Sequence, residues 1–369
     1  MTRSLTIFSL VTDAFGGRGG ISQYNRDFLG ALAECKIVDS ILILPRRTFD
    51  VAEIPSAKIR QAPTPLGQFA YIITALWLTL FKRFDLVFCG HIYLAPLALI
   101  IARLGGAKLV VQTHGIEAWP QSSCLRRAAL EAADLVLCVS RYTRQALLMW
   151  AAIAPERVLV LPNTVGAEFS SGDGATLRSK WGLTGKRIIL TVSRLDAGER
   201  YKGHDRVFAA MVTLVPQMRD LVYVVVGEGD DRIRIEALAR EVGVDDYVFF
   251  AGAVDRATLI ESYRMADVFV MPSTGEGFGI AFLEAMASGT PAVGLNIGGT
   301  PDALGDGELG AVVSEAELSK TIAQALSATK PDPHVLSHRV QARFGRNIFA
   351  GQVGAILDRV VGNGPFRAC

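Results

Sequence analysis

The chain has 369 residues, of which 50% are hydrophobic and 20% are charged, and its formal net charge at pH 7 is +2. This length and apolar content can fill two compact domains, each with its own core, and exclude a single small domain. The five cysteines lie at positions 35, 89, 124, 138 and 369 without a paired C-x-x-C spacing. An odd, unpaired set predicts neither a disulfide framework nor a zinc site and fits a reducing cytoplasm best.

Short apolar runs alternate with helix-length segments in the first half of the chain. The first run, "LTIFSLV", follows Arg3 and ends before Asp13. It predicts a first strand better than a secretion signal, because the run is short and no small-residue cleavage site follows. A helix is predicted for residues 21–33, and later strands for "SILIL", "DLVFCG", "AKLVVQT", "DLVLCVS" and "RVLVLP". Strands that are apolar on successive residues are buried on both faces, which is typical of a parallel sheet covered by helices.

The apolar segment Phe69–Phe81 contains thirteen residues and is too short to cross a bilayer. One interpretation is a buried helix. The other is a helix that rests on a membrane surface beside Lys82 and Arg83. Residues 1–165 contain 17 basic against 11 acidic residues, a balance of +6, whereas the rest contains 21 against 25, a balance of −4. The basic first half could meet anionic lipid or a substrate that carries a diphosphate.

After Pro162 the pattern breaks into the Gly- and Ser-rich stretch 163–183, which predicts a connector between domains. Apolar runs then resume as "RIILTVSRL", "LVYVVVGEG", "YVFFAGAV", "DVFVMPS" and "PAVGLN". The closing segment 346–361 reads as an amphipathic helix. We therefore expect an α/β protein with two doubly wound, Rossmann-like domains that face a central ligand cleft.

Charged and glycine-rich motifs follow the predicted strands of the second half. Arg194 ends "RIILTVSR", and Lys202 lies close to a helix predicted for residues 205–214. Two cations near strand ends suit a phosphate. The stretch "TGEGFGIAFLEA" contains Gly275, Gly277 and Gly279 and predicts a helix that begins near Phe278 and ends at Gly289. Glycines allow a ligand to approach the backbone, and the free amides of a helix N-terminus near Phe278 and Gly279 favour an anion.

Two carboxylates accompany this predicted helix. Glu284 lies inside it among apolar neighbours, so it is expected to be buried, and a buried carboxylate needs partners. It could accept two hydrogen bonds from a vicinal diol such as a ribose. Glu276, in the loop before the helix, could reach hydroxyls on the group joined to the phosphate. An exposed pair of solvated acids is the alternative interpretation.

These residues together resemble the retaining glycosyltransferases of family four, which have the two-domain GT-B fold. The resemblance is strongest over residues 187–313 and rests on "SRL", the lysine of "YKG", "VGEG" and the E-x7-E pair of "GEGFGIAFLEAMASGTPAV". It implies transfer of a sugar from a nucleotide-diphosphate donor, with UDP or GDP as carrier. It further implies an acceptor-binding domain at 1–165, a donor-binding domain at 166–344, and a helix at 345–369 that crosses back to the first domain.

The resemblance also implies roles for single residues. Arg194 and Lys202 would stabilise the leaving diphosphate, Glu284 would hold the ribose and Glu276 the donor sugar, and the base would lie near Gly252. In the first half, Gly19 and Gly20 of "GGRGGISQYNRDFL" would form the loop against the diphosphate and acceptor, and His114 of "VVQTHGIEAW" would point toward the transferred sugar.

The first half also departs from the family's pattern or permits simpler interpretations. The two glycines could merely form a tight turn, and His114 could be a structural histidine. Gly115 stands where many family members have Asp, and Asp302 where many have Glu.

Other functions are weaker or remain open. No G-x-G-x-x-G follows the first strand and no P-loop motif occurs, which disfavours a dehydrogenase and a P-loop kinase. A sugar-nucleotide epimerase, a glycosyl phosphorylase and a nucleotide-binding module without activity remain alternatives. The scattered histidines and the missing D-x-D and H-E-x-x-H motifs predict a metal-independent reaction without a cofactor. The expected partners are a nucleotide sugar, a glycan or lipid-linked glycan acceptor, and the inner face of a bacterial membrane, with no nucleic acid.

Overall fold

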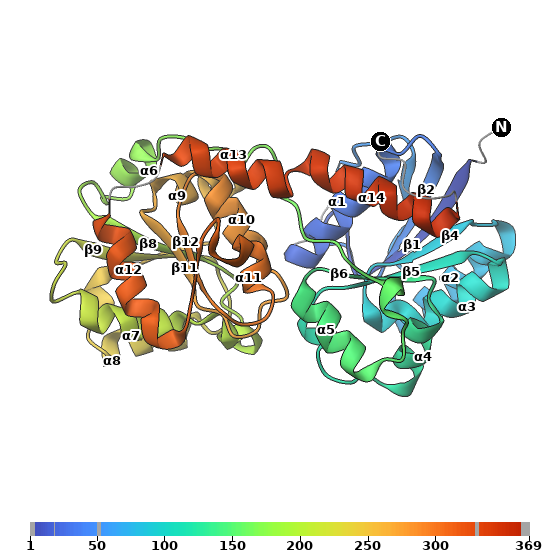
Figure 1. Cartoon of the computed structure of the whole chain (residues 1–369), viewed down its shortest axis with the longest axis horizontal. Coiled ribbons are helices and arrows are strands. Elements are labelled where there is room, and N and C mark those ends of the chain that lie inside the picture. Colours follow the sequence, from blue (N-terminus) through green and yellow to red (C-terminus); the bar gives the residue numbers. More distant parts are fainter. Residues whose placement is uncertain (1–3, 18, 50–52, 329–331, 363–369) are drawn as a thin grey trace. The chain divides into compact units, whose positions relative to one another are not determined.

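The computed structural model describes residues 4–17, 19–49, 53–328 and 332–362. Contacts between residues divide the chain into two compact units. The first unit contains Met1–Thr164 and Arg346–Cys369, and the second contains Val165–Gly345. Each unit is a parallel sheet with helices on both faces (Figure 1).

In the first unit, the described residues form a sheet of parallel strands in the order β3-β2-β1-β4-β5-β6-β7. The first strand lies in the middle, and successive strands are added outward on both sides of it. The strands are β1 (Leu5–Val11), β2 (Val38–Pro45), β3 (Ile59–Gln61), β4 (Leu86–Cys89), β5 (Lys108–Thr113), β6 (Leu135–Cys138) and β7 (Val158–Val160).

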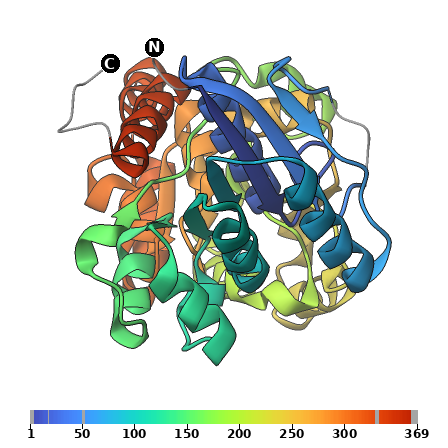
Figure 2. The ribbon, with the colours of Figure 1, turned by 90° about the vertical axis from the view of Figure 1, so that its right-hand side faces the viewer.

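Two groups of helices cover this sheet. Side chains of α2, α3, α4 and α5 share one apolar core with the strands, and α1 packs with α14 through Tyr24 and Phe349. Figure 2 shows α14 as the red helix of this unit. The α-helices are α1 (Gly20–Glu34), α2 (Gly67–Phe81), α3 (Ala95–Gly105), α4 (Cys124–Ala132), α5 (Arg141–Trp150) and α14 (Arg346–Val361). Short 3-10 helices occupy Ile92–Leu94, Ile116–Ala118 and Pro155–Arg157.

The second unit repeats this design with the strand order β10-β9-β8-β11-β12-β13, again parallel throughout. Side chains of α7, α8 and α12 form its main core with the sheet. The strands are β8 (Arg187–Val192), β9 (Leu221–Val226), β10 (Val248–Gly252), β11 (Val268–Met271), β12 (Ala292–Leu295) and β13 (Ala311–Val313). The α-helices are α6 (Ala175–Lys180), α7 (His204–Leu214), α8 (Arg232–Glu241), α9 (Arg256–Met265), α10 (Ile280–Ala287), α11 (Thr300–Ala303), α12 (Leu318–Ser327) and α13 (Pro333–Phe344).

The doubly wound parallel architecture expected from the apolar runs is confirmed. In such sheets the functional loops follow the carboxyl ends of the strands, near the point where the strand order reverses. That point lies between β1 and β4 in the first unit and between β8 and β11 in the second. The loops after these strands therefore position the candidate site residues of each unit.

Two expectations about local structure need correction. The stretch 163–183 is not a bare connector, because it contains α6 and buries Phe169 and Leu177 in the core of the second unit. The apolar runs also do not predict β3 and β13, which are three residues long and lie at sheet edges. Two of the three residues of β3 are polar, and Gly310 and Ser314 flank β13, so neither strand lies in a longer apolar run such as "RVLVLP" around the equally short β7.

The apolar segment Phe69–Phe81 belongs to α2, and its interpretation as a buried helix is wrong. Tyr71 and Ala75 are the buried residues of α2, and its other face is open to solvent. The burial pattern of a helix depends on what packs against it, which the composition of α2 could not reveal. No helix among the described residues is long and apolar enough to cross a membrane.

Candidate active site

The β8–α7 loop of the second unit carries the two predicted cations. Arg194 lies two residues beyond β8, and its side chain is 67% exposed and pairs with Glu199 of the same loop. Lys202 ends the 3-10 helix Ala197–Lys202, one residue before Gly203, the N-cap of α7. Gly203 adopts a φ of +88°, and an added Cβ would lie 2.4 Å from the carbonyl oxygen of Pro272. Because Gly203 has no side chain, the loop can lie directly against the residue that follows β11.

Lys202 and Glu276 form an enclosed ion pair although they lie far apart in the sequence. The Lys202 Nζ donates to Glu276 Oε2 at 2.8 Å, and their side chains are only 16% and 12% exposed. Burial alone would lower the pKa of Lys202, but the attraction of Glu276 and its hydrogen bond raise that pKa above its ordinary value. Lys202 therefore keeps its positive charge at neutral pH, and the two predicted residues lie together.

Aromatic side chains pack closely against the glycine-rich loop between β11 and α10. An added Cβ on Gly275 would lie 2.9 Å from the Tyr201 ring, and one on Gly279 would lie 2.6 Å from the Phe282 ring. Gly279, the N-cap of α10, has a φ of +102°. The carbonyl oxygen of Gly277 lies so close to Gly299 that Gly299 has no room for a side chain. The loop therefore packs directly against the backbone at Gly299.

Helix α10 begins at Ile280, two residues later than expected near Phe278, and ends at Ala287. Phe278 is buried and contacts Phe344 edge to face at 5.8 Å between ring centroids. Phe278 therefore anchors the loop, and the unpaired amides of the helix N-terminus begin beyond it.

Glu284 lies in α10 with a side chain that is 12% exposed. Its Oε2 accepts a hydrogen bond of 2.8 Å from the hydroxyl of Tyr263, a fully buried residue of α9. Its Oε1 lies 3.5 Å from Nη1 of Arg256, which also binds Glu168 at 2.6 Å and stacks over Phe169. Burial and the Glu284 carboxylate raise the pKa of Tyr263 well above its ordinary value, so its hydroxyl stays protonated and can donate.

Gly252 ends β10 and has a φ of +72°. Its carbonyl oxygen accepts a 2.8 Å hydrogen bond from the amide of Gly227, and an added Cβ would lie 2.7 Å from Glu228 Oε1. Gly252 is therefore held by the "VGEG" turn that follows β9. The structure places the predicted residues of the second unit in the loops after β8 and β11 and at the end of β10, with Glu284 in α10.

In the first unit, the predicted glycines lie where α1 begins. Gly19 is the N-cap of α1 with a φ of +90°, and Gly20 is its first residue. An added Cβ on Gly19 would meet nothing within 4 Å, whereas one on Gly17 would lie 2.4 Å from Ser22 Oγ and 2.7 Å from Asp13. Close packing therefore requires glycine at position 17, whereas at Gly19 the positive φ favours glycine.

His114 follows β5, and its ring orientation is set by the backbone. Its Nε2 lies 2.8 Å from the carbonyl oxygen of Gly90, so Nε2 carries the proton and Nδ1 is left as an acceptor. His91, which the sequence did not single out, lies next to it with 5.9 Å between ring centroids. Its Nδ1 accepts from the Tyr93 amide at 3.2 Å, so its Nε2 is the donor. Burial lowers the pKa of both histidines to about 4, which keeps them neutral at physiological pH.

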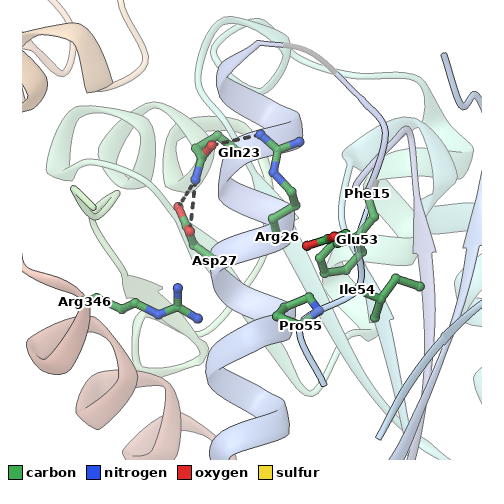
Figure 3. A pocket seen from close by; sticks show the side chains of 8 residues that line it. All are labelled: Phe15, Gln23, Arg26, Asp27, Glu53, Ile54, Pro55 and Arg346. Carbon is green, nitrogen blue, oxygen red and sulfur yellow. Dashed lines mark hydrogen bonds between the residues drawn. The ribbon is translucent and has the colours of Figure 1, made fainter. Parts of the chain in front are cut away.

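A separate open pocket of about 540 Å³ lies in the first unit and contains none of the predicted residues (Figure 3). Arg26 of α1 donates to the carbonyl oxygens of Ala14 and Gly17 at 2.9 Å each and to Gln23 at 2.8 Å. Arg26 thus ties the glycine loop to α1. The pocket is lined by Phe15, Gln23, Arg26, Asp27, Glu53, Ile54, Pro55 and Arg346.

The four cysteines in the described part of the chain form no disulfide with one another. Cys35, Cys89, Cys124 and Cys138 are free thiols, and burial raises the pKa of Cys89 and Cys138 to about 12. Cys369 lies outside the described residues. Within those residues, no group of three His, Cys, Asp or Glu side chains is arranged to hold a metal ion.

Several neighbours of the candidate site were missed by sequence reasoning. Tyr263 and Arg256 contact Glu284, Tyr201 packs under Gly275, and His91 lies beside His114. Tyr263 belongs to no motif, and a single tyrosine in a helix of mixed composition looks like any other core residue. Tyr201 is the tyrosine of "YKG", and His91 comes directly after the run "DLVFCG", so the sequence offered a signal for both.

Two doubly wound parallel α/β units, each with its candidate site residues near the carboxyl ends of its strands, are the architecture of the GT-B class of glycosyltransferases. Two family models match the chain: "Glycosyl transferases group 1" over residues 174–343 and "Glycosyltransferase Family 4" over residues 18–169. The chain belongs to the family 4 glycosyltransferases, and the suspected resemblance is confirmed. It is therefore an enzyme that transfers a sugar from a nucleotide-sugar donor.

The chain is similar over most of its length to curated relatives. It is 30% identical to the GDP-mannose-dependent alpha-(1-6)-phosphatidylinositol monomannoside mannosyltransferase of Mycolicibacterium smegmatis, over 88% of this chain and 89% of the relative. The enzyme of the same name from Mycobacterium tuberculosis H37Rv is also 30% identical, over 82% and 84%. Alignment with the D-inositol 3-phosphate glycosyltransferase of Acidothermus cellulolyticus is 37% identical but covers only 43% of this chain and 37% of that protein.

Solved structures support the fold. HepE of Anabaena in complex with UDP-glucose matches with a TM-score of 0.78 at 20% identity, over 96% of this chain and all of that one. Sucrose-phosphate synthase from Thermosynechococcus elongatus matches with a TM-score of 0.74 at 23% identity, over 97% of this chain and 100% of that one. At these identities the likeness shows the GT-B fold and says nothing of the substrate.

Proposed function

We propose that this enzyme transfers a hexose, with retention of anomeric configuration, from a nucleoside-diphosphate sugar to a lipid-linked glycan acceptor. The donor binds the second unit, and the acceptor binds the first. GDP-mannose is the donor to test first, because the relatives from Mycolicibacterium smegmatis and Mycobacterium tuberculosis, which align over 88% and 82% of the chain, are named GDP-mannose-dependent mannosyltransferases. Their named acceptor is a phosphatidylinositol mannoside, which favours a glycolipid acceptor and a step in bacterial glycolipid or polysaccharide assembly.

The observation that carries the donor site is the enclosed pair of Lys202 and Glu276 in the same unit as Glu284. In an enclosed site a charged group interacts strongly with a developing charge, because little water screens it. Lys202 stays protonated and can stabilise the diphosphate as the bond between the anomeric carbon and the phosphate oxygen breaks. Arg194, which is exposed and held by Glu199, would supply a second cation to the same leaving group.

The carboxylates and the backbone amides would bind the other parts of the nucleotide sugar. Glu284 would accept hydrogen bonds from the two ribose hydroxyls, and the amides at the start of α10 would bind phosphate oxygens. Glu276 would hold Lys202 in place and bind a hydroxyl of the donor sugar. Gly252, with Gly277 and Gly279 of the loop, would admit base and sugar close to the backbone.

In the first unit, Gly19 and Gly20 would bring the loop before α1 toward the diphosphate and the acceptor. His114 would accept a hydrogen bond from a sugar hydroxyl through Nδ1, because Gly90 occupies its Nε2. This role requires the neutral imidazole, which the lowered pKa supports. The reaction needs no metal in this mechanism, since the cations and amides meet the charge of the diphosphate.

The decisive experiment is calorimetric titration of GDP and UDP into the wild type and the Glu284→Ala variant, in the presence of EDTA. We expect one nucleotide to bind the wild type and to lose about 10- to 100-fold in affinity in the variant, from the roughly 1.5–3 kcal/mol of a charged hydrogen bond. Transfer of radiolabelled mannose from GDP-mannose to detergent-dispersed glycolipid, with the product's anomeric configuration determined by NMR, then tests the reaction.

The matched control is Glu308→Ala, which removes a carboxylate of the same unit that pairs with Arg343 on the surface and is 70% exposed. It should bind nucleotide as the wild type does. Equal nucleotide affinity in Glu284→Ala and wild type would show that Glu284 does not hold the ribose. Binding that requires added magnesium or manganese would refute the metal-independent site.

A further inference from the structure

Helix α2 exposes an apolar face that none of the described residues of the first unit covers. Its fifteen residues contain no charged side chain. At about 100° per residue, its most exposed large side chains fall within about a third of the helix circumference, opposite the buried Tyr71 and Ala75. They are Phe69 (82% exposed), Ile73 (66%), Trp77 (56%), Leu80 (79%) and Phe81 (70%).

Neighbouring residues extend this surface. Leu66, directly before α2, is 93% exposed. Helix α3 lies beside α2 (Figures 1 and 2) and exposes Ile100 and Leu104. We call these eight side chains the apolar face: Leu66, Phe69, Ile73, Trp77, Leu80, Phe81, Ile100 and Leu104. A surface helix normally turns polar residues to water, so eight exposed large apolar side chains on and beside two packed helices indicate an interaction site.

Basic side chains border the apolar face. Lys82 and Arg83 follow α2 directly, and Arg103 lies in the last turn of α3; all three are exposed. Neither helix contains Asp or Glu. A second copy of the chain placed with its α2 and α3 against this face would therefore offer these cations no partner, whereas the phosphates of anionic lipids would.

We propose that the apolar face is a docking surface for an anionic lipid bilayer, on which α2 lies parallel to the membrane plane. A helix of fifteen residues is about 22 Å long, shorter than the roughly 30 Å hydrocarbon core, so α2 rests in the interface and does not cross it. The aromatic and aliphatic side chains enter the boundary of headgroups and acyl chains, and Lys82, Arg83 and Arg103 bind the headgroup phosphates. Docking would bring the enzyme to the lipid-linked acceptor of the proposed function, on which the inference rests for its biological purpose.

The test is flotation of the full chain with vesicles of phosphatidylcholine, with and without 30% phosphatidylglycerol, at low salt. We expect binding to the anionic vesicles, and at least a tenfold weaker partition for the double variant Ile73→Asp, Leu80→Asp. The matched control is Ile233→Asp, Val335→Asp, which places the same two charges on exposed apolar positions of the second unit and should bind as the wild type does.

Two further measurements identify the occupant. Lys82→Ala with Arg83→Ala should weaken binding to anionic vesicles about thirtyfold, at about 1 kcal/mol per basic residue near the surface, and should leave binding to neutral vesicles unchanged. Brominated lipids should quench the fluorescence of Trp77, and the Trp77→Phe variant should lose that quenching.

Failure of the proposal has a distinct signature. Equal partition of the two aspartate double variants, or absence of wild-type binding, would overturn it. A wild type that sediments as a dimer and becomes monomeric in Ile73→Asp, Leu80→Asp would assign the face to a second copy. Nucleotide titration and sugar transfer to a detergent-dispersed acceptor do not need a bilayer. A negative result with vesicles therefore does not contradict the proposed function. Likewise, a negative result in the nucleotide and transfer assays does not contradict membrane docking.

Discussion

At the scale of single residues, the carboxylate of Glu284 is held from two sides by side chains of α9. Tyr263 donates to one oxygen from a fully buried position, and Arg256 lies at the longer distance of 3.5 Å from the other. Glu168 binds the same guanidinium at 2.6 Å and Phe169 stacks under it, so Arg256 keeps partners if its contact with Glu284 loosens. The tyrosine contact is thus the shorter and more enclosed restraint on Glu284.

We therefore predict that Tyr263→Phe raises the donor KM and the Kd of the nucleotide about tenfold, while kcat changes less than threefold. The physical reason is the loss of one hydrogen bond to a charged group, worth about 1.5 kcal/mol, which leaves Glu284 free to adopt other rotamers. Steady-state kinetics and calorimetry measure the two quantities.

A deoxynucleotide separates positioning from simple destabilisation. The wild type should bind the 2′-deoxy nucleotide more weakly than the ribonucleotide, and Tyr263→Phe should show a smaller difference between the two ligands. Arg264→Ala, on the same helix but paired with Glu261, should retain the full difference. If Tyr263→Phe lowers the unfolding temperature yet leaves the ratio of the two affinities unchanged, Tyr263 is only a core residue.

At the scale of elements, α11 supports the glycine-rich loop. The Gly299 amide donates to the Glu276 carbonyl oxygen at 2.8 Å, and an added Cβ on Gly299 would lie 2.0 Å from the carbonyl oxygen of Gly277. Real atoms do not approach so closely, so the start of α11 can accept only glycine unless the loop moves.

Gly299→Ala is accordingly expected to displace the loop that carries Glu276, to reduce the free energy of unfolding by about 1–3 kcal/mol through overpacking, and to weaken nucleotide binding at least tenfold. Urea denaturation and calorimetry measure both effects. Gly351→Ala in α14 is the control, because its Cβ would meet nothing within 4 Å; it should be neutral or stabilising by up to about 1 kcal/mol. Unchanged nucleotide affinity in Gly299→Ala would show that the loop position does not matter for the donor.

At the scale of the whole molecule, buried histidines make stability depend on pH. Burial lowers the folded-state pKa of His91, His114 and His204 to about 4, against an ordinary value of 6.5. Between these values the unfolded chain binds protons that the folded chain does not. Their contribution to stability is therefore fully present above pH 6.5 and is lost as the pH falls toward 4.

We expect the free energy of unfolding to decrease as the pH is lowered from 6.5 to 4. Below pH 4 the three histidines should cause no further decrease. Each histidine contributes up to about 1.4 kcal/mol per pKa unit. Urea denaturation across this range measures the slope, which His204→Gln should reduce. A stability that is flat across the range would contradict neutral, buried histidines.

The parallel α/β architecture can be predicted from the amino-acid sequence alone, because most buried strands and helices show an apolar pattern within their own few residues. The E-x7-E motif likewise placed Glu276 and Glu284 around one helix start, because both lie on the same local segment. Only the tertiary structure paired Lys202 with Glu276 and Tyr263 with Glu284, residues that are 74 and 21 positions apart, since such contacts depend on how separate loops and helices pack. It alone also decided that one apolar face of α2 is buried and the other is open, because a helix that is apolar on all sides carries no sign of which side meets the core.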